Sequence, residues 1–154
     1  MRPLTDKELE LRDRRRNGFE EFLSERMDIL ADFARALGLS TPPMIVNDPE
    51  RYLPGIDAFM QTTAVEPKDR AWITTRLGYL VGEVLIQRLG GAWLLCEVPE
   101  SKFFLRYVVG EFSAVKNSNA IADPFLVAHT LLSEPPGSSL TRLINEAERD
   151  LKNV

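Results

Sequence analysis

A few side chains in this sequence carry groups that could act as an acid, a base or a nucleophile. Glu83 stands inside the apolar segment YLVGEVLIQRLGGAWLL, where burial could shift its pKa into the range of a general acid or base. His129 or Asp123 could complete a hydrolase-type site if the fold brought either of them to Glu83. Cys96 is the single cysteine and could serve as a nucleophile.

The structural interpretation of Glu83 is favoured, because no second catalytic group stands at a recognisable spacing from it. A carboxylate on a helix with apolar residues nearly all round needs hydrogen-bonding partners. Arg76, Arg106 and the backbone amides of a following sheet are the candidates. We therefore expect Glu83 to tie its helix to a neighbouring element.

His129 and Cys96 also have structural interpretations. His129 follows Phe125 by four residues, near the apolar face of a helix, and no serine or cysteine stands at the spacing of a triad motif. Cys96 alternates with Leu94 and Val98, as a buried strand residue does. We therefore assign no catalytic residue, and expect His129 to be satisfied or half-exposed and Cys96 to be buried.

Glycines in the same segment indicate close packing followed by a turn. Gly78 and Gly82 share one helical face, and since each costs about 1 kcal/mol inside a helix, a close approach of another backbone is expected there. Gly90 and Gly91 should cap the helix and turn the chain into a sheet. A phosphate-binding loop is excluded, because it would place glycines after a strand and before a helix. Trp93 then opens the sheet as a core residue.

The basic run RDRRR near the N-terminus invites a nucleic-acid interpretation. Most of its arginines, however, stand four residues from a glutamate, and only Arg15 lacks such a partner. The pairs are Glu8–Arg12, Glu10–Arg14 and Arg16–Glu20. Pairs at this spacing stabilise a helix by a few tenths of a kcal/mol each. We therefore favour a solvated, self-paired helix face.

Composition indicates a single globular domain over residues 1–154. Of the 154 residues 44% are hydrophobic and 27% charged, and the net charge of −4 argues against a general nucleic-acid binder. One histidine and one cysteine are too few for the usual zinc sites, whereas a carboxylate site for magnesium or calcium stays open. No motif in the sequence indicates a metal or other cofactor, so none is assigned. The N-terminus is too polar for a signal peptide and no apolar run approaches the ~20 residues of a membrane span. These features predict a cytoplasmic protein without membrane contact.

The N-terminal part of the chain is expected to be helical. The segment TDKE has the spacing of a capping box, an apolar stripe at helical spacing follows, and Gly38 closes the helix. The stripe begins only at Phe19. Residues 1–17 should therefore project from the body, or form a separate short helix hinged near Gly18.

A proline-rich connector leads to the central helix. The segment STPPMIVNDPERYLPG, with prolines at 42, 43, 49 and 54, is expected to lead into a small helix in GIDAFMQTTA. Pro67 should stand in the first turn of the next helix, which runs to about Leu89. Trp72, near its start, could cover the edge of the core or lie in an interface, and we favour the core.

After Gly91 the apolar period changes from helical to alternating. AWLLCEV and KFFLRYVV should form a hairpin, and EFSAV either a third strand or a continuation of the second through a bulge at Gly110. Asp123 and Pro124 should cap and begin a helix, EPPGSS should break it, and LTRLINEAERDL should form the last helix. The predicted class is α+β: a small antiparallel sheet of two or three strands packed on helices, with N-terminal helices and two C-terminal helices.

The segments YLVGEVLIQRLGGAW and ADPFLVAHTLL, with the short sheet between them, resemble a group of small uncharacterised bacterial domains. In those domains a helix with a Gly-Glu pair leads through a glycine turn to a strand that begins with Trp, and an Asx-Pro-Phe segment starts a later helix. The resemblance covers residues 76–133. The matching positions are Tyr79, Gly82, Glu83, Gly90, Trp93, Asp123, Pro124 and Phe125. It implies a fold-defining role for Glu83, and some of these domains resemble accessory or immunity proteins of bacterial toxin systems.

Two functional hypotheses follow. The favoured one is a non-enzymatic protein that binds another protein, as an immunity-type or adaptor protein does. The sequence shows no catalytic constellation, whereas an acidic surface and a projecting charged helix suit protein recognition. Self-association into a homo-oligomer is compatible with this hypothesis. The alternative is a hydrolase-type enzyme that uses Glu83 with His129 or Asp123.

Overall fold

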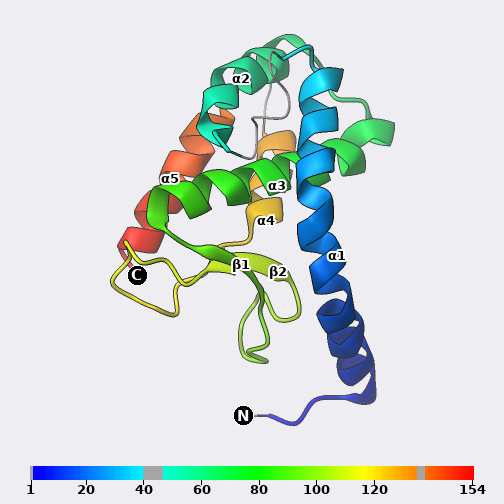
Figure 1. The fold of residues 1–154 in the computed structure, drawn as a ribbon, viewed down its shortest axis with the longest axis vertical. Helices are drawn as coiled ribbons and strands as arrows, with labels where there is room; N and C mark the ends of the chain where they lie inside the picture. Colours follow the sequence, from blue (N-terminus) through cyan, green and yellow to red (C-terminus); the bar gives the residue numbers. More distant parts are fainter. Residues whose placement is uncertain (1, 40–46, 135–137) are drawn as a thin grey trace.

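A computed structural model describes residues 2–39, 47–134 and 138–154 of the chain. It confirms the α+β class, with a two-stranded antiparallel sheet and helices packed around it (Figure 1). The expected connector prolines Pro42 and Pro43, and the middle of the expected helix break EPPGSS, lie outside the described residues.

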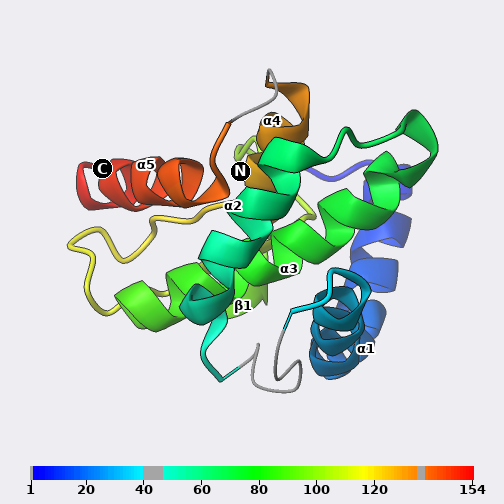
Figure 2. The same cartoon turned by 90° about the horizontal axis from the view of Figure 1, so that it is seen from above.

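The central element is α3 (Arg70–Leu89), and every other helix and both strands lie around it (Figures 1 and 2). The other helices are α1 (Asp6–Ala36), α2 (Leu53–Thr62), α4 (Pro124–Ser133) and α5 (Leu140–Lys152), with short 3-10 helices η2 (Pro49–Tyr52) and η3 (Pro67–Asp69). The strands are β1 (Ala92–Leu95) and β2 (Tyr107–Gly110). Because α3 is enclosed, its residues from Leu77 to Leu85 are buried on all sides. Gly90, with a φ of +68°, ends α3 as predicted.

The helix α1 is unbroken over 31 residues, so the alternative of a hinge near Gly18 is wrong. The predicted capping box is confirmed, because the Thr5 side chain accepts a hydrogen bond from the Glu8 amide and the Glu8 carboxylate accepts one from the Thr5 amide. None of residues 2–29 is buried, and the first buried side chain is Leu30. The first turns of α1 extend beyond the sheet (Figure 1). We call residues 6–18 the N-terminal arm.

The hairpin is shorter than predicted. The strand β2 begins only at Tyr107, because Leu105 has a φ of +63° and interrupts the alternation expected over KFFLRYVV. Residues 101–106 form turns instead. The segment EFSAV is neither a third strand nor a continuation of the second, since the chain turns away at Glu111, whose φ is +55°. A single bridge joins Ala122 to Val109 in its place.

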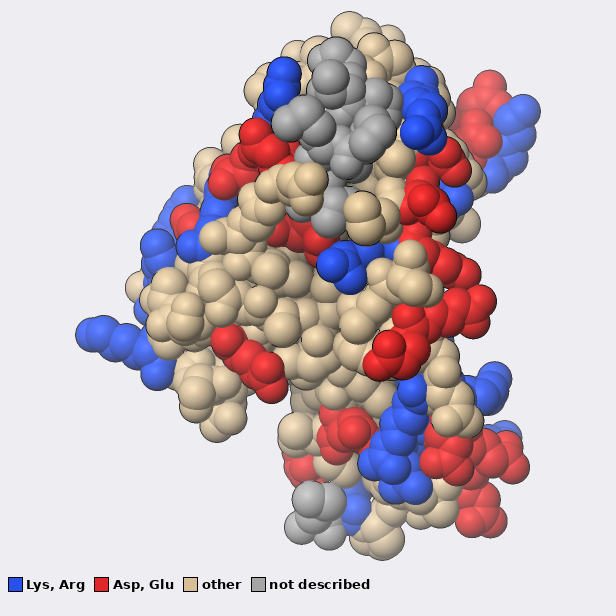
Figure 3. All heavy atoms as spheres, in the orientation of Figure 1, with Lys and Arg blue, Asp and Glu red and all other residues tan. Residues whose placement is uncertain are grey.

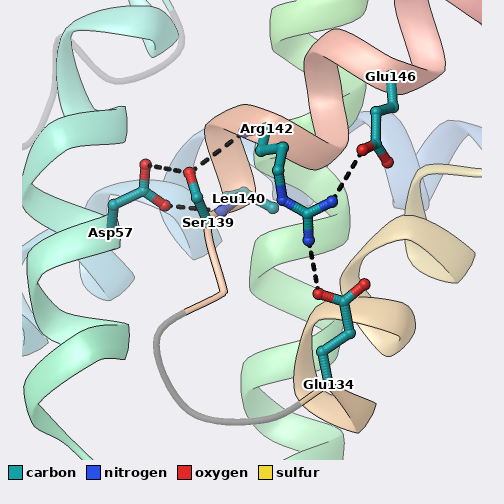
Figure 4. Close-up of polar contacts among 6 residues, drawn as sticks. All are labelled: Asp57, Glu134, Ser139, Leu140, Arg142 and Glu146. Atoms are coloured by element: carbon teal, nitrogen blue, oxygen red, sulfur yellow. Dashed lines mark hydrogen bonds and ion pairs between the residues drawn. The ribbon is translucent and has the colours of Figure 1, made fainter.

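The last helix, α5, is fixed to α2 through Asp57, a residue that the sequence did not single out (Figure 4). The Asp57 carboxylate accepts hydrogen bonds from the Leu140 amide at 2.7 Å and the Ser139 hydroxyl at 3.1 Å. A carboxylate in this place neutralises the positive end of the helix dipole. Arg142 then pairs with Glu134 at the end of α4. These contacts join α5 to α2, which is far away in the sequence, and to the end of α4, which directly precedes it.

Candidate functional site

Glu83 lies in the core and binds two partners that the sequence did not predict. Trp93 Nε1 donates a hydrogen bond to Glu83 Oε2 at 2.8 Å, and Arg26 Nε donates to Glu83 Oε1 at 3.3 Å. The expected partners Arg76 and Arg106 are engaged elsewhere, with the Trp72 carbonyl and Asp123 respectively. The sequence could not reveal Arg26, because 57 positions separate it from Glu83. Glu83 thus joins α3 to both α1 and β1.

The glycines on the face of α3 permit the approach of aromatic rings rather than of another backbone. A Cβ atom on Gly82 would lie 2.1 Å from the Trp93 ring, and one on Gly78 would lie 2.1 Å from the Phe125 ring. The Trp93 and Phe125 rings also contact each other, at a centroid distance of 5.9 Å. The two glycines therefore leave room for these aromatic rings to pack directly against α3.

Asp123 is buried and starts α4 as predicted. Its Oδ1 accepts hydrogen bonds from the amides of Phe125 and Leu126 at 3.0 and 3.2 Å. Its Oδ2 accepts one from Arg106 Nη1 at 3.0 Å. The preference of Asp and Pro for the first positions of a helix thus accounts for Asp123 and Pro124. Both carboxylate oxygens already have partners within the fold.

The remaining candidates have different environments. Cys96 and Trp93 are buried, as predicted. His129 is exposed on α4 and forms no hydrogen bond to Asp123 among the described residues. Trp72 is 41% exposed, so it is not a buried core residue. Its ring covers Phe33 at the edge of the core, with a centroid distance of 5.7 Å, and this is the first of its two expected placements.

None of the three surface pairs predicted within α1 is among the ion pairs of the described residues, and Arg12 pairs instead with its neighbour Asp13. Glu8 pairs with Arg2 rather than with the arginine one turn later, because the capping box holds its carboxylate at the helix start. Arg16 faces the hairpin, and its Nε donates to Glu97 Oε1 at 2.6 Å. Tyr107 donates a hydrogen bond to the Arg15 carbonyl at 2.7 Å. The arm is therefore attached to the sheet by one side.

A pocket of about 420 Å³ lies where the arm, the hairpin and α4 meet. It is open to solvent and has an aromatic floor with basic side chains at its rim. The lining residues are Arg15, Phe22, Arg106, Tyr107, Asp123, Phe125, Leu126 and His129. The pocket thus brings together two of the predicted site residues, Asp123 and His129, whereas Glu83 is not among those that line it. Nothing in the sequence groups the other lining residues with these two, since three distant segments contribute them.

The tyrosines beside the pocket retain their protons well above neutral pH. Burial raises the pKa of Tyr79 to about 12, and its hydroxyl donates a hydrogen bond to the Phe22 carbonyl at 3.0 Å. Burial also raises the pKa of Tyr107. Both hydroxyls therefore act as hydrogen-bond donors that fix α1 to the body, rather than as bases.

Residues 2–39, 47–134 and 138–154 contain no group of three or more His, Cys, Asp and Glu side chains placed to hold a metal ion. Of the helices in these ranges, none combines the length and apolar composition that crossing a membrane requires.

Comparison with known proteins gave no relatives. No protein-family model, curated protein sequence or solved structure matches this chain. The pocket and the contacts of its residues are therefore the basis for any functional assignment.

Proposed function

We propose that this protein is a non-enzymatic binding protein, of the immunity or adaptor type, and that it recognises another protein with the surface formed by the arm and the pocket. The observation that carries this proposal is the pocket itself. It is open, it has an aromatic floor, and it is formed by three elements whose relative position the fold determines. Aromatic and arginine side chains are the residue types enriched in protein interfaces.

The environments of Glu83 and Asp123 support a binding function rather than a catalytic one. A general base needs an oxygen that is free to accept a proton from the substrate. Both oxygens of Glu83 accept hydrogen bonds within the core, and both oxygens of Asp123 accept hydrogen bonds from α4 and the hairpin. Each carboxylate therefore has a structural use.

A hydrolase-type enzyme is the competing proposal. Its support is that Asp123 and His129 line the same pocket. Glu83 lies beneath Trp93, and its hydrogen bonds hold it in the core. Turnover would therefore depend on His129, the exposed member of this set.

The experiment is affinity capture from the native lysate with two matched variants. Leu126 is 42% exposed and lines the pocket, whereas Val98 is 56% exposed and does not line it. We expect a stoichiometric protein partner with the wild-type chain and Val98→Glu, and its loss with Leu126→Glu, while all three chains melt alike. Hydrolysis of a small-molecule library that His129→Ala abolishes, without a captured partner, would contradict the proposal.

A further inference from the structure

The charge at the pocket is opposite in sign to the charge of the whole protein. The chain has a net charge of −4, yet two arginines, Arg15 and Arg106, line the pocket beside a single acid, Asp123. That carboxylate is buried and already bound by Arg106 and by two amides of α4. It therefore leaves the rim with an excess of positive charge.

The two arginines of the rim retain donors for a ligand. The guanidinium of Arg15 lies 5.7 Å from the centroid of the Tyr107 ring, and no carboxylate in the described parts of the chain pairs with it. The Arg106 side chain is 52% exposed and uses Nη1 for Asp123. Since a guanidinium carries five N–H donors, most of those on Arg106 remain available.

The floor between these arginines is apolar and firmly held. The Phe22 ring packs against the Tyr107 ring at 4.4 Å and lies 6.2 Å from the Phe125 ring. Phe125 packs against Gly78 of α3, where no side chain could replace the hydrogen without displacing the ring. A rigid aromatic floor of this kind loses little conformational entropy when it binds an apolar side chain.

From these observations we propose that the pocket binds an acidic segment of a partner protein, with one large apolar side chain on the aromatic floor and a neighbouring carboxylate at Arg15 and Arg106. This inference rests on the proposed binding function and specifies the chemistry of the partner.

The charge around the pocket favours a short acidic segment over a nucleic acid. Acidic side chains gather along α1 beyond the arm (Figure 3). The exposed ones are Glu20, Glu21, Glu25, Asp28 and Asp32. A long polyanion that reached the arginines would also meet this acidic surface, whereas a peptide with one or two carboxylates would not.

The test is selection of random displayed peptides on the full chain, with two charge-reversal variants of the arm. Arg15→Glu changes the rim, and Arg14→Glu makes the same change at an exposed neighbour that does not line the pocket. We expect the selected peptides to carry Asp or Glu next to a large apolar residue. Their affinity should fall about tenfold or more with Arg15→Glu and stay nearly unchanged with Arg14→Glu.

Several outcomes would overturn the inference. These are selected peptides that are neutral or basic, no enrichment over the Arg15→Glu chain, or equal binding by both variants. Single-stranded DNA that binds the wild type and not Arg15→Glu would assign the pocket to a nucleic acid. A dimer in light scattering that Arg15→Glu dissociates would make a second copy the occupant.

The acidic-segment inference can fail while the proposed function stands. If the native partner stays bound to Arg15→Glu but is lost with Leu126→Glu, the acidic-segment inference is wrong while protein binding stands.

Discussion

Glu83 shows how one polar side chain can hold three elements of an apolar core together. A buried carboxylate is unfavourable unless its hydrogen-bonding capacity is used, and Trp93 and Arg26 use both oxygens. The partners come from β1 and α1, so the charge is satisfied only when both have docked on α3. This requirement links the position of α1, and with it one wall of the pocket, to the core.

Replacing Glu83 with Gln should lower the free energy of unfolding by about 1–3 kcal/mol. The amide group would present two N–H donors to either Arg26 or Trp93, which are donors themselves. Denaturant unfolding of Glu83→Gln measures the loss, and Glu20→Gln, which removes the same charge from an exposed site, is the control. An unchanged midpoint for Glu83→Gln would show that the carboxylate does not stabilise the fold, and would favour a catalytic role.

Glu8 offers a separate test at the start of α1. Hydrogen bonds from Arg2, followed in importance by the Thr5 amide, lower the pKa of Glu8 from its usual 4.5 to about 2. Because the folded pKa is depressed, the contribution of the cap is present above about pH 4.5 and is lost as the pH falls through about 2. An NMR titration of the Glu8 carboxyl group should show this low midpoint, and Arg2→Ala should raise it. A wild-type midpoint near the usual value would mean that the capping contacts do not persist in solution.

Among the helical segments, the arm contributes least to the core. Its polar and ring contacts with the body include the hydrogen bond from Tyr107 to the Arg15 carbonyl, the Arg16–Glu97 ion pair and the position of Arg15 near the Tyr107 ring. Exposed ion pairs contribute about 0–1 kcal/mol and a hydrogen bond about 1 kcal/mol. The arm therefore contributes little to the free energy of unfolding, and its larger contribution is to the surface around the pocket.

A chain that begins at Gly18 should still fold cooperatively, with a free energy of unfolding lower by about 1–2 kcal/mol. Denaturant unfolding with light scattering checks this. The same truncation removes Arg15 from the pocket, so binding of the partner should weaken much more than stability does. Aggregation, or the loss of a cooperative transition, would instead show that residues 2–17 belong to the folding unit.

The sequence predicts elements well where local signals mark their ends, as the segment TDKE, Gly90 and Asp123 do. The sequence does not predict structure well where local patterns carry no information about the backbone conformation or about contacts between distant residues. The alternating pattern of KFFLRYVV does not reveal that Leu105 takes a positive φ, so the predicted strand was too long. The pocket is beyond such reasoning for the same reason, because its arginines come from the arm and from the turn before β2.

The protein separates the residues that stabilise the fold from those proposed to bind a partner. The core is continuous around α3, where side chains from the other helices and both strands meet. The arm and the rim of the pocket lie outside that core. The acidic surface of α1 also lies outside it (Figure 3). Substitutions on the rim can therefore change binding without unfolding the body, and this separation makes the proposed charge reversals informative.

This separation predicts that amide hydrogens exchange much more slowly in α3 than in the arm. Amides of residues 77–85 in α3 are enclosed on all sides, so they should exchange only through global unfolding. Amides of the arm belong to the same kind of hydrogen-bonded helix, but no buried side chain holds them, so they should exchange through local opening.

Exchange followed by NMR on the intact chain measures both sets at once. In a mild denaturant series, the α3 amides should follow the global free energy of unfolding while the arm amides stay nearly independent of denaturant. Equal protection of the arm and α3 would mean that α1 opens only with the whole molecule, and that the arm is part of the cooperative core despite its exposed side chains.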